Sequence, residues 1–263
     1  MKIRNHHLVK FTTLALAAAF FASGAATRAD EIQPVKKNKW ENVAALGLTL
    51  TRGNSKTFLA TATINSTRKW DHDEALLGLS AGYGETTANV GKNETTSTTD
   101  NYIKGFGQWN HDFSGTWASN FYGGLRLGIE RDAVADLDYR MTVSPLLGYY
   151  LLKRTNTFVA LEAGPSFVYE KQGGDEKSYM AARVAERAEY KFHSGAKVWE
   201  SIEWLPQVDN FDNWIANSEF GVSAPISKTI DIRLVLQDTY DNQPAEGRYK
   251  NDLKLIAALG FKF

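Results

Sequence analysis

The sequence predicts an all-β fold: a transmembrane, antiparallel, up-and-down β-barrel of about 12 strands. Three observations lead to this prediction. From Trp40 to Phe263 apolar and polar residues alternate with a period of two. The alternating segments are mostly longer than the five or six residues usual in soluble sheets, and close to the roughly 9–11 residues that a tilted strand needs to cross a bilayer. Aromatic residues gather towards the ends of these segments, as in the girdles of membrane barrels.

The first residues have the pattern of a secretory signal peptide. Lys2, Arg4 and Lys10 form a basic start, an apolar run at 11–21 follows, and small residues lead to Ala29. The apolar run is too short to span a bilayer as a helix. We therefore expect a signal peptide at 1–29, a polar periplasmic lead-in at 30–39 and a barrel at 40–263.

Charge and cysteine content exclude several classes of function. The chain has 30 basic and 30 acidic residues, and removal of 1–29 takes away four basic residues and no acidic one. The acidic excess that remains argues against nucleic acid as a partner. The chain has no cysteine, which excludes a lipoprotein anchor and a cysteine nucleophile.

The final segment shows the alternation best. Leu253, Leu255, Ala257, Leu259 and Phe261 alternate with Lys254, Ile256, Ala258, Gly260 and Lys262, and the chain stops on Phe263. A strand sends these two sets to opposite faces. The same pattern upstream predicts strands at 40–51, 56–70, 75–86, 101–111, 116–130, 138–151, 157–170, 179–192, 197–207, 213–224, 229–240 and 249–263.

The predicted connections are alternately short and long. Tight turns are expected at 71–74, 112–115, 152–156, 193–196 and 225–228. Longer loops are expected at 87–100, 131–137, 171–178, 208–212 and 241–248, while the first hairpin, at 52–55, is short. Short turns face the periplasm in membrane barrels, so both termini should lie on the periplasmic side. The aromatic residues expected at the two membrane edges are Trp40, Trp70, Trp109, Trp117, Tyr149, Trp199, Trp204, Trp214, Tyr240 and Phe263.

Two motifs resemble a known family. The first hairpin reads Thr49-Leu50-Thr51-Arg52-Gly53-Asn54-Ser55, and a central hairpin runs from Tyr122-Gly123-Gly124 through Glu130-Arg131-Asp132 to Asp138-Tyr139-Arg140. Both resemble the YdiY-like salt-induced outer-membrane protein family, also called domain of unknown function 481. The resemblance runs from about Trp40 to Phe263. It implies a Gram-negative outer-membrane barrel and carries over no activity.

Because successive residues of a strand point to opposite faces of the sheet, the alternation places charged side chains of both signs inside the barrel. Charges in a narrow interior must pair or stay hydrated. The interpretations are a salt-bridge network that fills the barrel, or a charged constriction that screens solutes. Small inward residues such as Gly47, Gly78, Ser80, Gly82, Gly84 and Ser144 would leave space and favour a passage. The constriction candidates are Arg126, Glu130, Arg140, Glu162, Arg183, Arg187, Glu219 and Arg233.

Other kinds of site have weaker patterns. His72, His111 and His193 fall in predicted turns, where histidines are usually solvated, and Asp209–Asn213 lacks the glycine and distal glutamate of a calcium loop. No histidine has the serine two residues away that outer-membrane phospholipases use. We therefore expect no metal, no cofactor and no enzyme activity.

The sequence leaves three functions to weigh. The first is a narrow, porin-like channel for ions or small polar solutes, linked to salt or osmotic stress by the family resemblance. The alternative is a closed structural or surface-interaction barrel without transport, and an outer-membrane hydrolase comes third. Expected partners are outer-membrane lipid, lipopolysaccharide and the barrel assembly machinery, which would read Phe261 and Phe263 as an assembly signal.

Overall fold

The computed structural model describes residues 38–52, 55–90, 93–113 and 119–263. The predicted signal peptide and residues 30–37 of the predicted lead-in lie outside these ranges, as does Trp117. The barrel is described from Asn38 onward.

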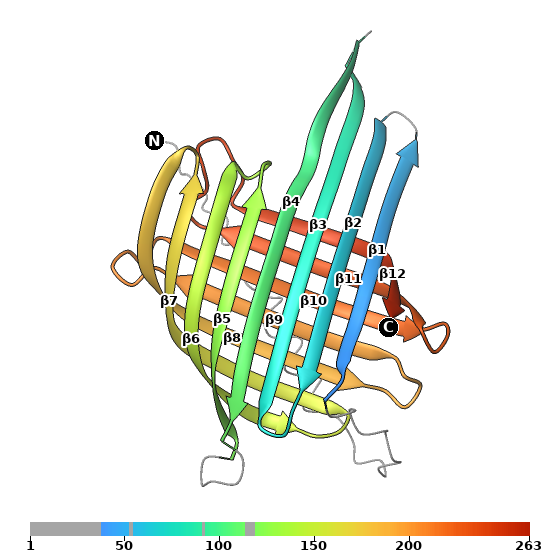
Figure 1. The fold of residues 1–263 in the computed structure, drawn as a ribbon. Coiled ribbons are helices and arrows are strands. Elements are labelled where there is room, and N and C mark those ends of the chain that lie inside the picture. The colour runs from blue at the N-terminus through green and yellow to red at the C-terminus, as the bar shows by residue number, and fades with distance from the viewer. Residues whose placement is uncertain (1–37, 53–54, 91–92, 114–118) are drawn as a thin grey trace, which may run out of the picture. The chain divides into compact units, whose positions relative to one another are not determined.

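Twelve antiparallel strands form one closed barrel (Figure 1). Each strand pairs with its neighbours in sequence, and β1 pairs with β12 to close the sheet, which confirms the predicted up-and-down topology. The strands are β1 (Trp40–Arg52), β2 (Ser55–Lys69), β3 (Asp73–Val90), β4 (Asn93–Asp112), β5 (Phe121–Asp132), β6 (Leu137–Lys153), β7 (Thr157–Gln172), β8 (Asp175–Lys191), β9 (Lys197–Pro206), β10 (Trp214–Pro225), β11 (Ile230–Asp241) and β12 (Asn251–Lys262).

The strands tilt against the barrel axis. The register of the strand pairs shows this tilt. Val43 lies near the start of β1, and stepping from each residue to its paired residue on the next strand leads to Tyr179 on β8, which lies near the opposite rim. The residues in between are Asn65, Gly78, Phe106, Gly128, Thr142 and Val168. A closed barrel requires such a stagger, which corresponds to a tilt of about 35–45°.

The apolar face of the sheet points outward. Leu46, Leu127 and Leu255 are 59%, 49% and 62% exposed, although large apolar side chains of a water-soluble protein are usually buried. Each of the remaining strands also has exposed large apolar side chains, for example Leu79 on β3 and Phe220 on β10. The buried residues on the inner face include charged and amide side chains such as Glu162, Arg183 and Asn110.

Aromatic side chains lie near both ends of the outward face. We call the end where β1 begins and β12 ends the terminal rim, and the opposite end the hairpin rim. Near the terminal rim, the rings of Phe121 and Tyr149 lie 4.8 Å apart. Near the hairpin rim, Trp214 stacks on Tyr240 with ring centroids 4.7 Å apart. Trp199 was predicted to belong to these rings but faces inward, where its indole donates to Glu219 at 2.7 Å.

Several predicted connections are wrong because strands continue through them. The segment predicted as a loop at 87–100 is almost entirely the extended end of β3 and β4 (Figure 1). Threonines favour strands, and Thr87 and Thr96 share a hydrogen bond of 2.8 Å across this hairpin. The predicted loop at 171–178 is a two-residue turn, because Gly173 and Gly174 both adopt positive φ and allow a tight hairpin.

The predicted difference in loop length between the two rims is also wrong. At the hairpin rim the strands of four hairpins are separated by 53–54, 91–92, 133–136 and 173–174, and only 207–213 and 242–250 are longer. At the terminal rim the connection from Asp112 to Phe121 is longer than expected, because β5 begins at Phe121 rather than at 116. The rims differ instead through the β3–β4 hairpin, which projects beyond its neighbours at one rim (Figure 1).

Candidate functional site: the interior charge network

The central part of the interior is organised around Glu162 of β7. Its side chain is fully buried. Carboxylate Oε1 accepts hydrogen bonds from Tyr122 at 2.7 Å and from Gln108 at 2.8 Å. Arg187 lies 3.1 Å from the same oxygen, and Arg183 donates to Oε2 at 2.9 Å. A buried carboxylate needs such partners, because an unpaired one would be very costly.

Arg183 and Glu203 extend this cluster across β8 and β9. The Arg183 Nε–Glu203 Oε1 distance is 2.5 Å. Arg126 of β5 lies 3.5 Å from the same oxygen and donates to Gln108 at 3.2 Å. The guanidinium of Arg126 also lies 4.1 Å from the centre of the Phe106 ring. Arg126 and Glu203 therefore form an ion pair between strands that are four apart in the sheet.

A further pair crosses the interior from β8 to β3. Arg187 lies 3.9 Å from Glu74, to which Asn110 donates at 3.2 Å. Strands β3 and β8 are five apart around a barrel of twelve, so this contact runs through the lumen rather than along the wall. We call this set the central network: Glu74, Gln108, Asn110, Tyr122, Arg126, Glu162, Arg183, Arg187 and Glu203.

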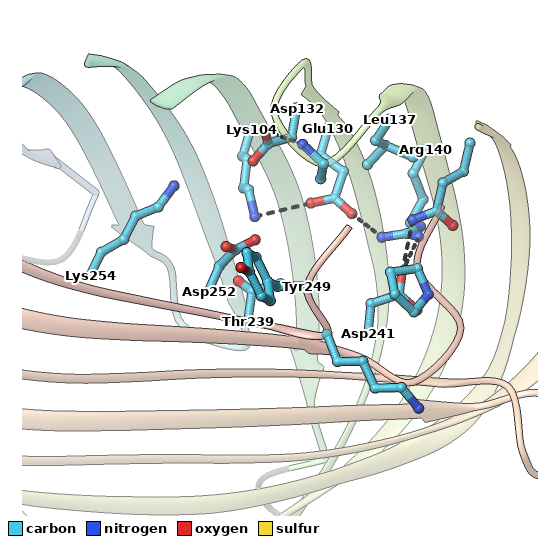
Figure 2. Close-up of a pocket in the computed structure, with 14 residues that line it drawn as sticks. Lys104, Glu130, Asp132, Leu137, Arg140, Thr239, Asp241, Tyr249, Asp252 and Lys254 are labelled. Carbon is cyan, nitrogen blue, oxygen red and sulfur yellow. Dashed lines mark hydrogen bonds and ion pairs between the residues drawn. The ribbon is translucent and has the colours of Figure 1, made fainter. Parts of the chain in front are cut away.

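A second set of charges, the rim network, lies towards the hairpin rim. Arg140 of β6 contacts Glu130 at 2.8 Å, Glu170 at 2.5 Å and Asp241 of β11 at 3.3 Å. Figure 2 shows Glu130 between Arg140 and Lys104, whose ammonium lies 3.4 Å away. The Arg140–Asp241 contact again joins strands five apart.

Lys254 completes the rim network from β12. Its ammonium is 2.9 Å from Asp100 and 4.1 Å from the centre of the Tyr102 ring, both on β4. Together with Lys104, Glu130, Arg140 and Asp241, it lines a pocket near this rim (Figure 2).

The remaining predicted charges lie apart from these two networks. Arg233 binds Asp231 on its own strand at 2.5 Å, and Lys262 lies 3.1 Å from the same carboxylate. Glu219 accepts hydrogen bonds from Trp199 and from Gln237 at 2.9 Å. Of the eight constriction candidates, four thus belong to the central network and two to the rim network, whereas Glu219 and Arg233 make separate local contacts.

The predicted open space beside the inward glycines is partly filled. A Cβ built on Gly78 would lie 2.2 Å from the Phe106 ring, and one on Gly82 would lie 2.4 Å from the Tyr102 ring. Aromatic side chains of β4 therefore cover the glycines of β3. Ser144 is also occupied, in a buried hydrogen bond with Ser166 of 2.7 Å.

The wall formed by β12, β1 and β2 has a stretch of short inward side chains. They are Ala45, Gly47, Thr61, Thr63 and Ala258, in register with one another across the three strands. No member of the central network comes from β10–β12, β1 or β2. Of the inward charges of β10–β12, Glu219, Asp231 and Arg233 make the separate local contacts, whereas Asp241 and Lys254 belong to the rim network.

The histidines lie close together only in part. The rings of His72 and His111 have centroids 6.4 Å apart. His111 lies near the end of β4 and binds Asp73 at 3.0 Å. Within the ranges that the structure describes, no group of His, Asp and Glu side chains is arranged to hold a metal ion. In the same ranges no helix is long and apolar enough to cross a membrane.

Comparison with known proteins identifies the family of this chain. A family model described as "Protein of unknown function, DUF481" matches residues 44–263. The chain belongs to the DUF481 family. This confirms the resemblance seen in the two hairpin motifs. No curated protein matches the DUF481 chain.

Several solved structures are similar to the DUF481 chain. The NanC porin is 9% identical, with a TM-score of 0.51 over 85% of the DUF481 chain and all of that porin. An outer-membrane channel from Pseudomonas putida F1 is 11% identical, with a TM-score of 0.48 over 89% of this chain and 100% of that one. The translocator domain of the autotransporter NalP from Neisseria meningitidis is 13% identical, with a TM-score of 0.46 over 85% of this chain and 88% of that one. The likeness to the NanC porin shows that the DUF481 chain has the fold of an outer-membrane β-barrel.

Residue parity missed several members of the DUF481 networks. Glu74 and Asp241 lie one residue outside the predicted strands 75–86 and 229–240, so extending the alternation by one residue places both side chains inside. Lys104 lies within the predicted strand 101–111, and its inward direction follows from the alternation there. Gln108, Asn110 and Tyr122 are uncharged, and the alternation alone does not distinguish them as partners of buried charges.

Proposed function

We propose that this protein is an outer-membrane barrel with a narrow polar passage for ions and small polar solutes. The observation that carries the proposal is the uneven filling of the interior. The ion pairs of the central network are anchored on β3–β9, whereas paired inward positions on β12, β1 and β2 carry the short side chains of Ala258, Gly47 and Thr61. The passage would run between the central network and this short-side-chain wall.

The outward face supports the membrane location. A continuous apolar surface with aromatic residues near both rims matches the belt and girdles of barrels in lipid. Export by the predicted signal peptide would deliver the chain to the outer membrane, with the terminal rim facing the periplasm. The β3–β4 hairpin would then project outward, where it could meet lipopolysaccharide.

The charge balance supports a small, weakly selective conduit. The central network contains three arginines and three glutamates, so no single sign of charge surrounds the passage. A ring of one sign would favour selection by charge. We propose discrimination chiefly by size, and no enzyme activity. The link to salt or osmotic stress rests on the family resemblance, and growth of a deletion strain in high salt tests it.

Planar-bilayer recordings test the passage directly. The refolded protein should give small, stable conductance steps. Ala258→Trp, which puts an indole into the lumen opposite the central network, should reduce the conductance several-fold. Ala257→Trp places the same indole on the exposed outer face and should leave the conductance unchanged. Wild-type protein that inserts into the bilayer without conducting would contradict the passage.

A closed barrel is the second candidate, and one observation favours it. Contacts cross the lumen at two levels, Arg187–Glu74 towards the terminal rim and Arg140–Asp241 near the hairpin rim. If these contacts seal the interior, the wild type and both tryptophan variants should be equally silent in the bilayer. The double substitution Arg187→Ala and Arg140→Ala should then create a conductance that the wild type lacks.

A further inference from the structure

Two glutamates occupy the outward face of the barrel. On β8, Arg183 and Arg187 point into the interior, so Glu186 between them points out, beside the exposed Val184. On β9, Trp199 and Glu203 face inward, so Glu200 points out with the exposed Trp204. Both lie within the apolar band, because Tyr190 and Phe192 lie nearer the terminal rim on β8.

The two carboxyl groups are neighbours. Glu186 is in register with Ile202 and Glu200 with Ala188, which makes them a diagonal pair across adjacent strands, with Cα atoms about 7–8 Å apart. On their outer sides they face Leu161 of β7 and Phe220 of β10. Among the described residues neither glutamate has a hydrogen bond or an ion pair.

Ionisable side chains that face lipid are expensive and rare, and mark functional positions by default. An unpaired carboxylate in hydrocarbon is strongly disfavoured, whereas the neutral acid both donates and accepts a hydrogen bond. Polar side chains of this kind hold membrane segments together. The pair therefore calls for a partner supplied from outside this chain.

We infer that the outer face of β8 and β9 binds a second copy of this chain, through hydrogen bonds between Glu186 and Glu200 of the two copies. This inference rests on the membrane location proposed above. Copies inserted in the same orientation hold these residues at the same depth. A two-fold axis along the membrane normal then brings each glutamate pair against its equivalent, and neutral carboxyl groups are complementary to themselves.

The shape of this face suits close approach. Its outward residues include Ala163 of β7 and Ala182 of β8, in contrast to the leucines of β1, β5 and β12. Small residues let membrane-embedded backbones approach closely. The two carboxyl groups thus lie near short side chains, on an outer surface whose other apolar side chains are bulky.

Cysteine cross-linking tests the contact, and the absence of native cysteine makes the readout clean. Val184→Cys places a thiol next to Glu186 on the outer face, at a position that is 47% exposed, and Leu79→Cys on β3 places one on a distant wall, at a position that is 50% exposed. In bilayers with mild oxidant, Val184→Cys should give disulfide-linked dimers and Leu79→Cys should give at least tenfold fewer. Equal yields for the two, or monomers alone at high protein density, would overturn the inference.

Two double variants test the chemistry in the Val184→Cys background. Replacing Glu186 and Glu200 by Gln keeps donors and acceptors and should retain the dimer. Replacing both by Leu should lower its yield at least tenfold. Cross-linking that needs Mg²⁺ and disappears in the Gln variant would overturn the hydrogen-bonded pair in favour of a bound cation. Failure to insert into bilayers would instead refute the proposed membrane location.

Discussion

Glu162 is the residue on which the central network depends most. It is the shared acceptor for Tyr122, Gln108, Arg183 and Arg187, and its side chain is fully buried. Both arginines retain other partners, Glu203 and Glu74, but the Arg187–Glu74 distance is 3.9 Å. Loss of the Glu162 charge would therefore leave Arg187 almost uncompensated.

We predict that Glu162→Gln lowers the free energy of unfolding by about 3–5 kcal/mol, the usual cost of breaking a buried ion pair. Urea unfolding in lipid vesicles, followed by tryptophan fluorescence, measures the change. Glu94→Gln is the matched control, because Glu94 pairs with Lys56 at the surface, where the two side chains are 57% and 50% exposed. Surface pairs contribute about 0–1 kcal/mol. Similar losses in the two variants would show that Glu162 has no special role.

At the scale of the element, the weakest seam is the closure between β1 and β12. Strand β1 pairs with β2 along its whole length, Trp40–Arg52, but with β12 only from Val43 to Gly47. Beyond that ladder, Asn42 and Phe263 exchange backbone hydrogen bonds of 3.3 and 3.1 Å, and the Asn42 amide donates to the Phe263 carbonyl. The last residue thus helps to close the barrel through its backbone, while its ring is 72% exposed.

Two variants at Phe263 distinguish the role of its backbone from the role of its ring. Deletion of Phe263 should weaken the seam and speed amide hydrogen exchange in β1 and β12. Phe263→Ala keeps the backbone and should leave exchange in refolded protein unchanged, but should reduce outer-membrane levels in cells if the assembly machinery reads the ring. Normal membrane levels of Phe263→Ala, measured by fractionation, would argue against an aromatic assembly signal.

The β3–β4 hairpin should be dispensable for stability. Beyond Thr87 and Thr96, β3 and β4 pair almost entirely with each other, the exception being Ala88, which also pairs with Ser55 of β2. Replacing 88–95 by Asn-Gly should therefore change the free energy of unfolding by less than about 1 kcal/mol, since a two-residue type I′ turn fits such a hairpin. Urea titration of the trimmed protein checks this. A larger loss would mean that the projecting part supports the barrel wall.

The same elements show what the sequence could and could not predict. Alternation identified all twelve strands and the inward direction of the arginines, because side-chain direction depends only on residue parity. It could not predict where strands end, since the Thr-rich tip of β3–β4 is polar on both faces and looks like a loop. Nor could it predict that Arg126, besides its contact with Gln108 on the neighbouring β4, would pair with Glu203 of β9, because that pairing depends on the stagger of strands around the closed barrel.

At the scale of the whole barrel, the apolar exterior is the property from which the membrane proposal follows. A water-soluble barrel would bury these side chains, whereas here leucines on β1, β3, β5, β6, β7 and β12 are exposed. Two tryptophans lie on opposite faces of the sheet and can serve as fluorescent probes of the outer and inner face. Trp109 on β4 points outward and is 51% exposed, while Trp199 on β9 points inward over Gly221 and binds Glu219.

Brominated lipids, which quench nearby indoles, therefore distinguish the faces. We predict strong quenching for a variant that keeps only Trp109 and weak quenching for one that keeps only Trp199, with Phe in place of the other tryptophans. Acrylamide in water should show the smaller effect on Trp109, because lipid shields it. Equal quenching by brominated lipid would mean that the two faces are not separated by the barrel wall. Stronger quenching of Trp199 would mean that the sheet is turned inside out relative to the lipid, since lipid contacts only the outer wall of a closed barrel.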